Sequence, residues 1–204
     1  MLLEEFSTIF DRPEKVKKLR EYILSLAVRG KLVPQDENDE PASVLLEKIK
    51  EEKDRLVKEK KIKKEKPLPE IGEDEIPYDL PKGWEWVRLG DIVSFSIGKT
   101  PNRKNSIYWD EGIYPWVSIS DMEHGQVIFN TKQKISHTAL DECFKGILVP
   151  KGTLIMSFKL TIGKLSILSM DALHNEAIVS IYPYFDEIKT FLFKLLNGFE
   201  LTSG

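Results

Sequence analysis

The chain has 204 residues, of which 41% are hydrophobic and 31% charged, and its formal net charge is −3 at pH 7. This length allows one globular domain with an appended element, or two small domains. The composition excludes a strongly basic protein that binds nucleic acid mainly by gripping phosphates, so any DNA role must depend on a local basic surface. The single cysteine, Cys143, excludes an internal disulfide and fits a reducing cytoplasm. With no signal-peptide pattern and no apolar run of membrane-spanning length, we expect a soluble cytoplasmic protein.

Residues 13–30 are predicted to form the first helix, because Pro13 suits a first turn and Gly30 suits a left-handed cap. Steps of three and four residues place one apolar stripe on this helix, formed by Val16, Leu19, Ile23 and Leu26. Two interpretations stay open. The stripe packs on the core of the chain itself, or it forms a seam for another helix, possibly on another chain.

A second helix is predicted from about Ser43 to Lys66, after a polar connector. Its apolar residues become fewer toward its C-terminal end. The residues expected to face a partner helix are Leu45, Ile49 and Leu56. The run VKEKKIKKEK that follows Leu56 has too little apolar surface to be held by burial. It is interpreted as a solvated extension, with contact to a phosphate backbone as the alternative.

Proline and acidic residues dominate from Pro67 to Pro81, which is typical of an extended linker. Short β-rich runs begin at Trp84: VRLGDIVSFS, YPWVSIS, ILVPKGTLIMSF, LSILS and AIVSIYPYF. Helices are predicted around His137–Phe144 and over Asp186–Asn197, the second with an aspartate cap. The predicted class is α+β, with a helical region at 1–66, a linker at 67–83 and a β-rich domain at 84–204.

No catalytic or metal site is predicted. Gly98, Lys99 and Thr100 resemble the end of a phosphate-binding loop, but Val93 stands where that motif needs another glycine. A metal-dependent nuclease built from Asp171, Glu187 and Lys189 remains an alternative that chance composition explains as well. Cys143 has no obvious histidine partner nearby in sequence and is interpreted as a small buried residue. We expect no cofactor to be bound by this chain.

The loop between Ser96 and Trp109 favours DNA recognition. It mixes cations with amides and hydroxyls and has no acid before Asp110; the candidate DNA-binding residues in it are Lys99, Thr100, Asn102, Arg103, Lys104 and Asn105. Cations hold phosphates, while arginine and asparagine can pair with guanine and adenine edges through two hydrogen bonds. The competing interpretation is an ordinary solvated loop. Trp109 is expected to anchor the loop to the core.

Further candidates lie in three other turns. They are Lys159, Thr161 and Lys164 in a hairpin turned at Gly163, Ser118 and Ser120 after one strand, and Asn175 before another. Plain hairpin polarity explains each of them equally well.

Several phrases of the sequence resemble the specificity subunits of type I restriction–modification enzymes. LREYILSLAVRGKLVPQ and DEPASVLLEKI look like the N-terminal conserved region of that family, and LPKGWEWVRLGDI looks like the start of a target-recognition domain. GKTPNRKNSIYW, YPWVSISDM, LVPKGTLIMSFKLTIGK and HNEAIVSIYP follow in the family's order. The resemblance extends from about Val16 to Leu196.

This resemblance implies a non-catalytic subunit that reads half of a split site in double-stranded DNA. It implies docking of modification subunits, which carry S-adenosylmethionine and methylate a flipped adenine, and of restriction subunits, which use ATP and magnesium. The family's pattern would continue past Gly204, so the resemblance implies a domain incomplete at its C-terminus. A fragment, a truncated product and a half-subunit that pairs with itself all remain open, as does an interaction module that docks partners without reading DNA.

Overall fold

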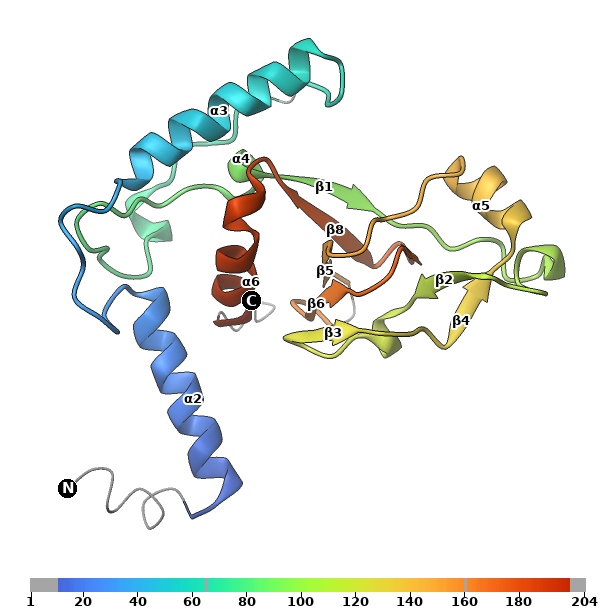
Figure 1. The fold of residues 1–204 in the computed structure, drawn as a ribbon, viewed down its shortest axis with the longest axis horizontal. Coiled ribbons are helices and arrows are strands. Elements are labelled where there is room, and N and C mark those ends of the chain that lie inside the picture. Colours follow the sequence, from blue (N-terminus) through green and yellow to red (C-terminus); the bar gives the residue numbers. More distant parts are fainter. Residues whose placement is uncertain (1–10, 65, 160, 199–204) are drawn as a thin grey trace. The chain divides into compact units, whose positions relative to one another are not determined.

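The computed structural model of the chain describes residues 11–64, 66–159 and 161–198 (Figure 1). It divides into two compact units, residues 1–88 and 89–204. The division lies after Arg88 rather than at Trp84, because the residues between them pack within the first unit. The indole N–H of Trp84 donates to Gln35 at 2.9 Å, and Trp86 meets Tyr78 edge to face, with ring centroids 5.0 Å apart.

The first unit contains helices α2 (Pro13–Val28) and α3 (Ala42–Lys58). Gly30 follows α2 with φ +64°, as predicted for a left-handed cap. The prediction that the second helix reaches Lys66 was wrong, since α3 ends at Lys58 and Lys60 has φ +57°. Arg55 pairs with both Glu52 and Glu59 at the end of α3, and beyond it too few apolar side chains remain to be buried.

The segment predicted to be an extended linker is held by its own contacts within the first unit. It includes the 3-10 helix η1 (Glu73–Glu75). Arg88 donates to the carboxylate of Glu75 and to the backbone carbonyls of Pro69 and Glu70, and the hydroxyl of Tyr78 donates to the carbonyl of Val28. Proline and acidic composition predicted an extended path correctly but carried no signal for these tertiary bonds.

The apolar stripe of α2 is not buried. Val16, Leu19 and Leu26 are half-buried and Ile23 is 42% exposed, so no residue of this helix is buried. On α3, Ile49 is buried while Leu45 and Leu56 are half-buried. The interpretation of the α2 stripe as part of the chain's own core is therefore wrong, and its interpretation as a seam for a partner helix stays a prediction.

The second unit contains two sheets (Figure 1). The five-stranded sheet has the order β1-β8-β5-β6-β3, with strands β1 (Val93–Ile97), β8 (Ile178–Pro183), β5 (Leu154–Ser157), β6 (Leu165–Leu168) and β3 (Gln126–Ile128). All its neighbours are antiparallel except β3 and β6, which are parallel. The three-stranded sheet has the order β4-β2-β7, with β4 (Gln133–Ile135), β2 (Tyr114–Val117) and β7 (Leu173–His174); β2 is antiparallel to β4 and parallel to β7.

Helices and short 3-10 turns complete this unit. They are α4 (Leu89–Ile92), η2 (Ser106–Tyr108), η3 (Ile119–Asp121), α5 (His137–Phe144), η4 (Asp186–Ile188) and α6 (Lys189–Gly198). The α+β class predicted from the sequence is confirmed. The predicted aspartate cap is wrong: Phe185 precedes η4 without a side-chain cap, and Asp186 lies within the first turn, where it pairs with Lys189 at 2.6 Å.

Strand β2 connects two hydrophobic clusters of the second unit. Successive side chains of a strand point to opposite faces. Val117 therefore packs with Ile155, Leu168 and Ile178 of the larger sheet, while Trp116 packs with Leu140 and other residues of and around α5. Both side chains are at most 1% exposed. Burying their apolar surface fixes where β2 lies, and hence where the loop leading into it must run.

None of the helices in the described part of the chain combines the length and the apolar character needed to cross a membrane.

The N-cap of α5 provides a test of the fold. The Ser136 hydroxyl accepts from the Ala139 N–H at 3.2 Å, so Ser136→Ala should lower the free energy of unfolding by about 1 kcal/mol. Urea denaturation measures this change. Ser96→Ala, at an exposed position of β1, is the control and should leave the midpoint nearly unchanged. Equal midpoints for the two variants would contradict the cap.

Candidate nucleic-acid interface

The loop from Gly98 to Trp109 is fixed at its start by a close approach of two backbones. A Cβ atom on Gly98 would lie 2.0 Å from the carbonyl oxygen of His174, so only glycine fits there. The Gly98 N–H donates to Ile178 and the Lys99 N–H donates to His174 at 2.9 Å. These amides are already bonded to carbonyls, which agrees with the prediction that this is not a phosphate-binding loop.

The middle of the loop is anchored by two tryptophans. Trp109 and Trp116 meet edge to face, with centroids 5.2 Å apart and an interplanar angle of 89°. The indole of Trp109 donates to the carbonyl of Asn102 at 3.2 Å, and that of Trp116 donates to the carbonyl of Lys99 at 3.0 Å. The structure thus agrees with the expected anchoring role of Trp109.

The guanidinium of Arg103 lies on this pair of rings. Its Cζ atom is 3.9 Å from the centroid of the Trp109 ring and 4.6 Å from that of Trp116. One of its N–H groups donates to Oε1 of Gln133 at 2.9 Å. Cation–π contacts of this kind hold an arginine side chain in place while its residue remains exposed. The loop therefore presents an arginine whose position is already set.

A carboxylate from the turn between β7 and β8 contacts the start of this loop. Oε2 of Glu176 accepts a short hydrogen bond from the Thr100 hydroxyl. This hydrogen bond is the main cause that holds the pKa of Glu176 below its ordinary value, and the charges of Lys159 and Arg103 act in the same direction. A hydroxyl and a carboxylate from segments far apart in the sequence therefore meet, and the charges of two cations act on that carboxylate.

We call these residues the Arg103 cluster: Thr100, Arg103, Gln133, Lys159 and Glu176. They come from the loop after β1, from β4, from the β5–β6 hairpin and from the turn between β7 and β8. Arg103, Gln133, Lys159 and Glu176 are exposed and Thr100 is half-buried. Such a set can hold a phosphate and also offer donors and acceptors to base edges. Gln133 was not predicted from the sequence, because nothing in the run QKI indicates that this residue contacts Arg103.

Of the other residues predicted in the loop, some form hydrogen bonds within the protein and others are exposed. The Oδ1 atom of Asn102 accepts from the Lys104 N–H at 3.0 Å, and the Asn105 N–H donates to the Asn102 carbonyl at 3.1 Å. These bonds shape the turn that presents Arg103. The Lys99 ammonium donates to the carbonyl of Cys143 at 3.1 Å. Lys104 is exposed.

The structure places the remaining predicted residues in turns of their own. Ser118 bonds Ser120 and Asp121, and Lys132 donates to the carbonyl of Ser120. Oδ1 of Asn175 accepts from the Ala177 N–H at 3.1 Å and so shapes the turn before β8.

The β5–β6 hairpin turns at Gly163, which has φ +84°, as predicted. Lys164 donates to the carbonyl of Met122 at 3.3 Å, whereas the Thr161 side chain is exposed. Of the predicted residues outside the first loop, only Lys159 joins the Arg103 cluster.

The catalytic alternatives gain no support. Asp171 accepts from the backbone N–H of Lys151 at 2.8 Å, and Lys189 pairs with Asp186. Within residues 11–64, 66–159 and 161–198, no three His, Cys, Asp or Glu side chains are placed to hold a metal ion. Burial, assisted by the nearby Glu142, raises the pKa of the Cys143 thiol, so this cysteine is not an activated nucleophile.

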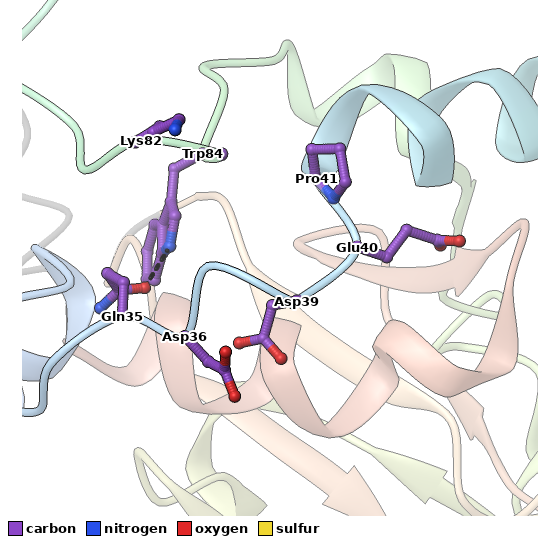
Figure 2. A pocket seen from close by; sticks show the side chains of 8 residues that line it. Gln35, Asp36, Asp39, Glu40, Pro41, Lys82 and Trp84 are labelled. Atoms are coloured by element: carbon purple, nitrogen blue, oxygen red, sulfur yellow. Dashed lines mark hydrogen bonds between the residues drawn. The ribbon is translucent and has the colours of Figure 1, made fainter.

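A pocket of about 280 Å³ in the first unit does not suit DNA either (Figure 2). It is lined by the connector between α2 and α3 and by residues 82–84, and two of its lining residues, Trp84 and Gln35, are joined by a hydrogen bond. Its lining includes the carboxylates of Asp36, Asp39 and Glu40, which would repel phosphate. Asp36 also accepts from the N–H and the side-chain amide of Asn38, as in a tight turn.

The second unit matches a known family model. Residues 81–201 match the model described as the type I restriction modification DNA specificity domain. The chain belongs to this family. The resemblance of its sequence phrases to type I specificity subunits is thereby confirmed at the level of the family.

Curated relatives of this specificity-domain family include two from Escherichia coli. The type I restriction enzyme EcoAI specificity subunit is 59% identical over 95 residues, which are 47% of this chain and 16% of that subunit. The EcoEI specificity subunit is 64% identical over 81 residues, or 40% of this chain and 14% of that subunit. The chain therefore matches less than a fifth of the length of either relative. The crystal structure of the HsdS subunit from Thermoanaerobacter tengcongensis is 17% identical, with a TM-score of 0.46, over 91% of this chain and 37% of that one.

A buried histidine supports the backbone on which the interface rests. His174 is 2% exposed; its Nε2 atom lies 2.6 Å from the Ser180 hydroxyl and its Nδ1 atom 3.2 Å from the carbonyl of Asn175. A carbonyl can only accept, so Nδ1 donates to it and Nε2 accepts from Ser180. Burial outweighs these bonds and lowers the pKa of His174 below its ordinary value.

This lowered pKa predicts acid sensitivity. The unfolded chain binds a proton at His174 more readily than the folded chain does. The contribution of His174 to the free energy of unfolding is therefore constant above about pH 6.5, and it decreases as the pH falls below that value. The free energy of unfolding, measured by urea denaturation from pH 7.5 to 5.5, should therefore decrease, by at most about 1.4 kcal/mol per pH unit for this one proton. His174→Gln should flatten the decrease, whereas His137→Gln, at an exposed position, should retain it. The same slope in all three proteins would refute the assignment.

Proposed function

We propose that this chain supplies a DNA-recognition domain of a type I restriction–modification assembly and reads one half of a split duplex site. In this proposal it catalyses no reaction. Its relatives are named as specificity subunits, and its second unit belongs to their specificity-domain family. The single observation that carries the proposal is the exposed residue Arg103, whose guanidinium is held on two indole rings and donates to Gln133.

The chemistry of the Arg103 cluster fits the major groove. Arginine can donate two parallel hydrogen bonds to O6 and N7 of guanine. Because Trp109 and Trp116 already hold Arg103, less side-chain entropy is lost when it binds a base. Lys159, with an exposed ammonium, suits a phosphate contact that sets the register of the protein on the duplex.

The charge balance implies that partners help to hold the DNA. A net charge of −3 provides little non-specific affinity for a polyanion. In the proposed assembly, modification and restriction subunits supply further contacts, bind S-adenosylmethionine, ATP and magnesium, and perform methylation and cleavage. The apolar stripe of α2, half-buried at three residues and exposed at Ile23, is the surface we assign to a partner helix. Such an assembly acts on DNA in the cytoplasm.

A second candidate function is supported by that same stripe. With Tyr22 62% and Ile23 42% exposed, α2 can dock a partner even if the second unit reads no sequence. In that case the chain is an interaction module and the Arg103 cluster is an ordinary polar surface.

Selection from a library of random duplexes separates the two functions. The chain, tested alone and with its modification subunit, should enrich a short motif if the second unit reads bases. Enrichment should fall as salt increases, because phosphate contacts release counterions. Binding without enrichment of any sequence would reject DNA reading and favour the interaction module.

Arg103 should matter for the choice of sequence. If it pairs with a guanine, Arg103→Ala should weaken binding to the selected half-site by about 1–3 kcal/mol and relax the preference at one position. Arg29 stacks on Tyr78 in the first unit, with 5.2 Å between its Cζ atom and the ring centroid, so Arg29→Ala is a matched control that should keep the preference. A loss of equal size on every duplex, measured by fluorescence anisotropy, would reassign Arg103 to a phosphate.

A further inference from the structure

Glu176 is an unusual group for a surface that meets DNA. Its carboxylate accepts a hydrogen bond from Thr100, the charges of Lys159 and Arg103 act on it, and its residue is exposed. An ionised carboxylate can only accept hydrogen bonds, and DNA phosphates offer only acceptors and negative charge. Glu176 therefore cannot serve as a phosphate contact, and it would weaken binding unless it meets a donor.

The structure holds this carboxylate in a set position. Thr100 bonds one of its oxygens, and that threonine follows the Gly98–Lys99 backbone docked on His174. The turn that carries Glu176 is fixed by Asn175, which accepts from Ala177 and whose own N–H donates to the carbonyl of Val117 at 3.0 Å. The carboxylate accepts from Thr100 and from its own backbone N–H, and because two ionised oxygens offer about four acceptor positions, it can still accept from a ligand.

The neighbouring charges keep Glu176 ionised and offset its repulsion of the DNA backbone. Its pKa lies below the ordinary value, first because of the Thr100 hydrogen bond and further because of Lys159 and Arg103. At neutral pH the group is therefore a hydrogen-bond acceptor on a surface whose exposed cations can contact phosphates.

The geometry points to Glu176 as a residue that determines specificity by accepting a hydrogen bond from the exocyclic amino group of a base. In the major groove this donor is N4 of cytosine or N6 of adenine. Cytosine is the expected partner, because adenine places the N7 acceptor beside its amino group, where it would repel a carboxylate. This inference rests on the proposed function, since it requires the second unit to face base edges.

The contrasting role for Glu176 is purely structural, namely to hold Thr100 and the loop. The two roles differ in what a variant changes. A structural role affects folding and all duplexes alike, whereas base reading affects the preference at a single position.

The experiment is duplex selection with the full chain and its Glu176→Ala and Glu176→Gln variants. Glu176→Ala should reduce discrimination for cytosine at one position by about ten-fold, which corresponds to about 1.4 kcal/mol. Glu176→Gln retains an oxygen for Thr100 and should keep the folding midpoint. Its amide can pair with N6 and N7 of adenine, so the preference at that position should shift from cytosine toward adenine.

A control with the same charge change is available at Glu187. This exposed residue lies past the other end of β8, a strand about 17 Å long. Glu187→Ala should keep the motif of the unsubstituted chain. If Glu176→Ala instead loses discrimination at an adenine position, the carboxylate still accepts from a base amino group, and that group is N6 of adenine.

Uniformly tighter binding of Glu176→Ala to all duplexes would overturn the inference, because only charge repulsion would then have been removed. An unchanged motif in both Glu176 variants would also overturn it while leaving the proposed function intact. If the unsubstituted chain selects no motif, the proposed function fails and this inference fails with it.

Discussion

The close approach of Gly98 to the backbone of His174 and Asn175 is the constraint on which the candidate interface depends. It brings the loop after β1 onto the turn between β7 and β8, so that Thr100 can reach Glu176. Any side chain at residue 98 would separate the two backbones. His174, buried and neutral beneath this contact, keeps its ring between Asn175 and Ser180. The polar surface is thus supported by a buried layer of hydrogen bonds.

Two tryptophans connect that surface to the hydrophobic core. Trp116 belongs to strand β2 and is almost fully buried, yet one face of its ring supports Arg103 and its N–H is bonded by the Lys99 carbonyl. An arginine side chain held on aromatic rings can be exposed and still be less mobile than an ordinary surface arginine. This explains how a chain with net negative charge can still present a defined cationic group to a polyanion.

Local sequence patterns predicted those helices and strands that contain enough apolar residues to show a periodicity of their own. The helices α2 and α5 and the strands β1, β5, β6 and β8 were expected from apolar periodicity, proline and glycine. Strands β3 and β4 were not expected, because they are three residues long and carry exposed glutamines and a lysine among their few residues. They are ordered by pairing with β6 and β2, and pairing across space leaves no mark in such short runs.

The sequence by itself determined the α+β class, the family and the basic, amide-rich character of the loop after β1, since each of these depends on residue type and order. Only the tertiary structure decided which residues meet. It joined Gln133 to Arg103 and Glu176 to Thr100, and it committed Ser118, Ser120 and Asn175 to turns. The reason is that a side chain's partners are set by the packing of strands far apart in sequence, whereas a turn and a recognition loop draw on the same polar residue types.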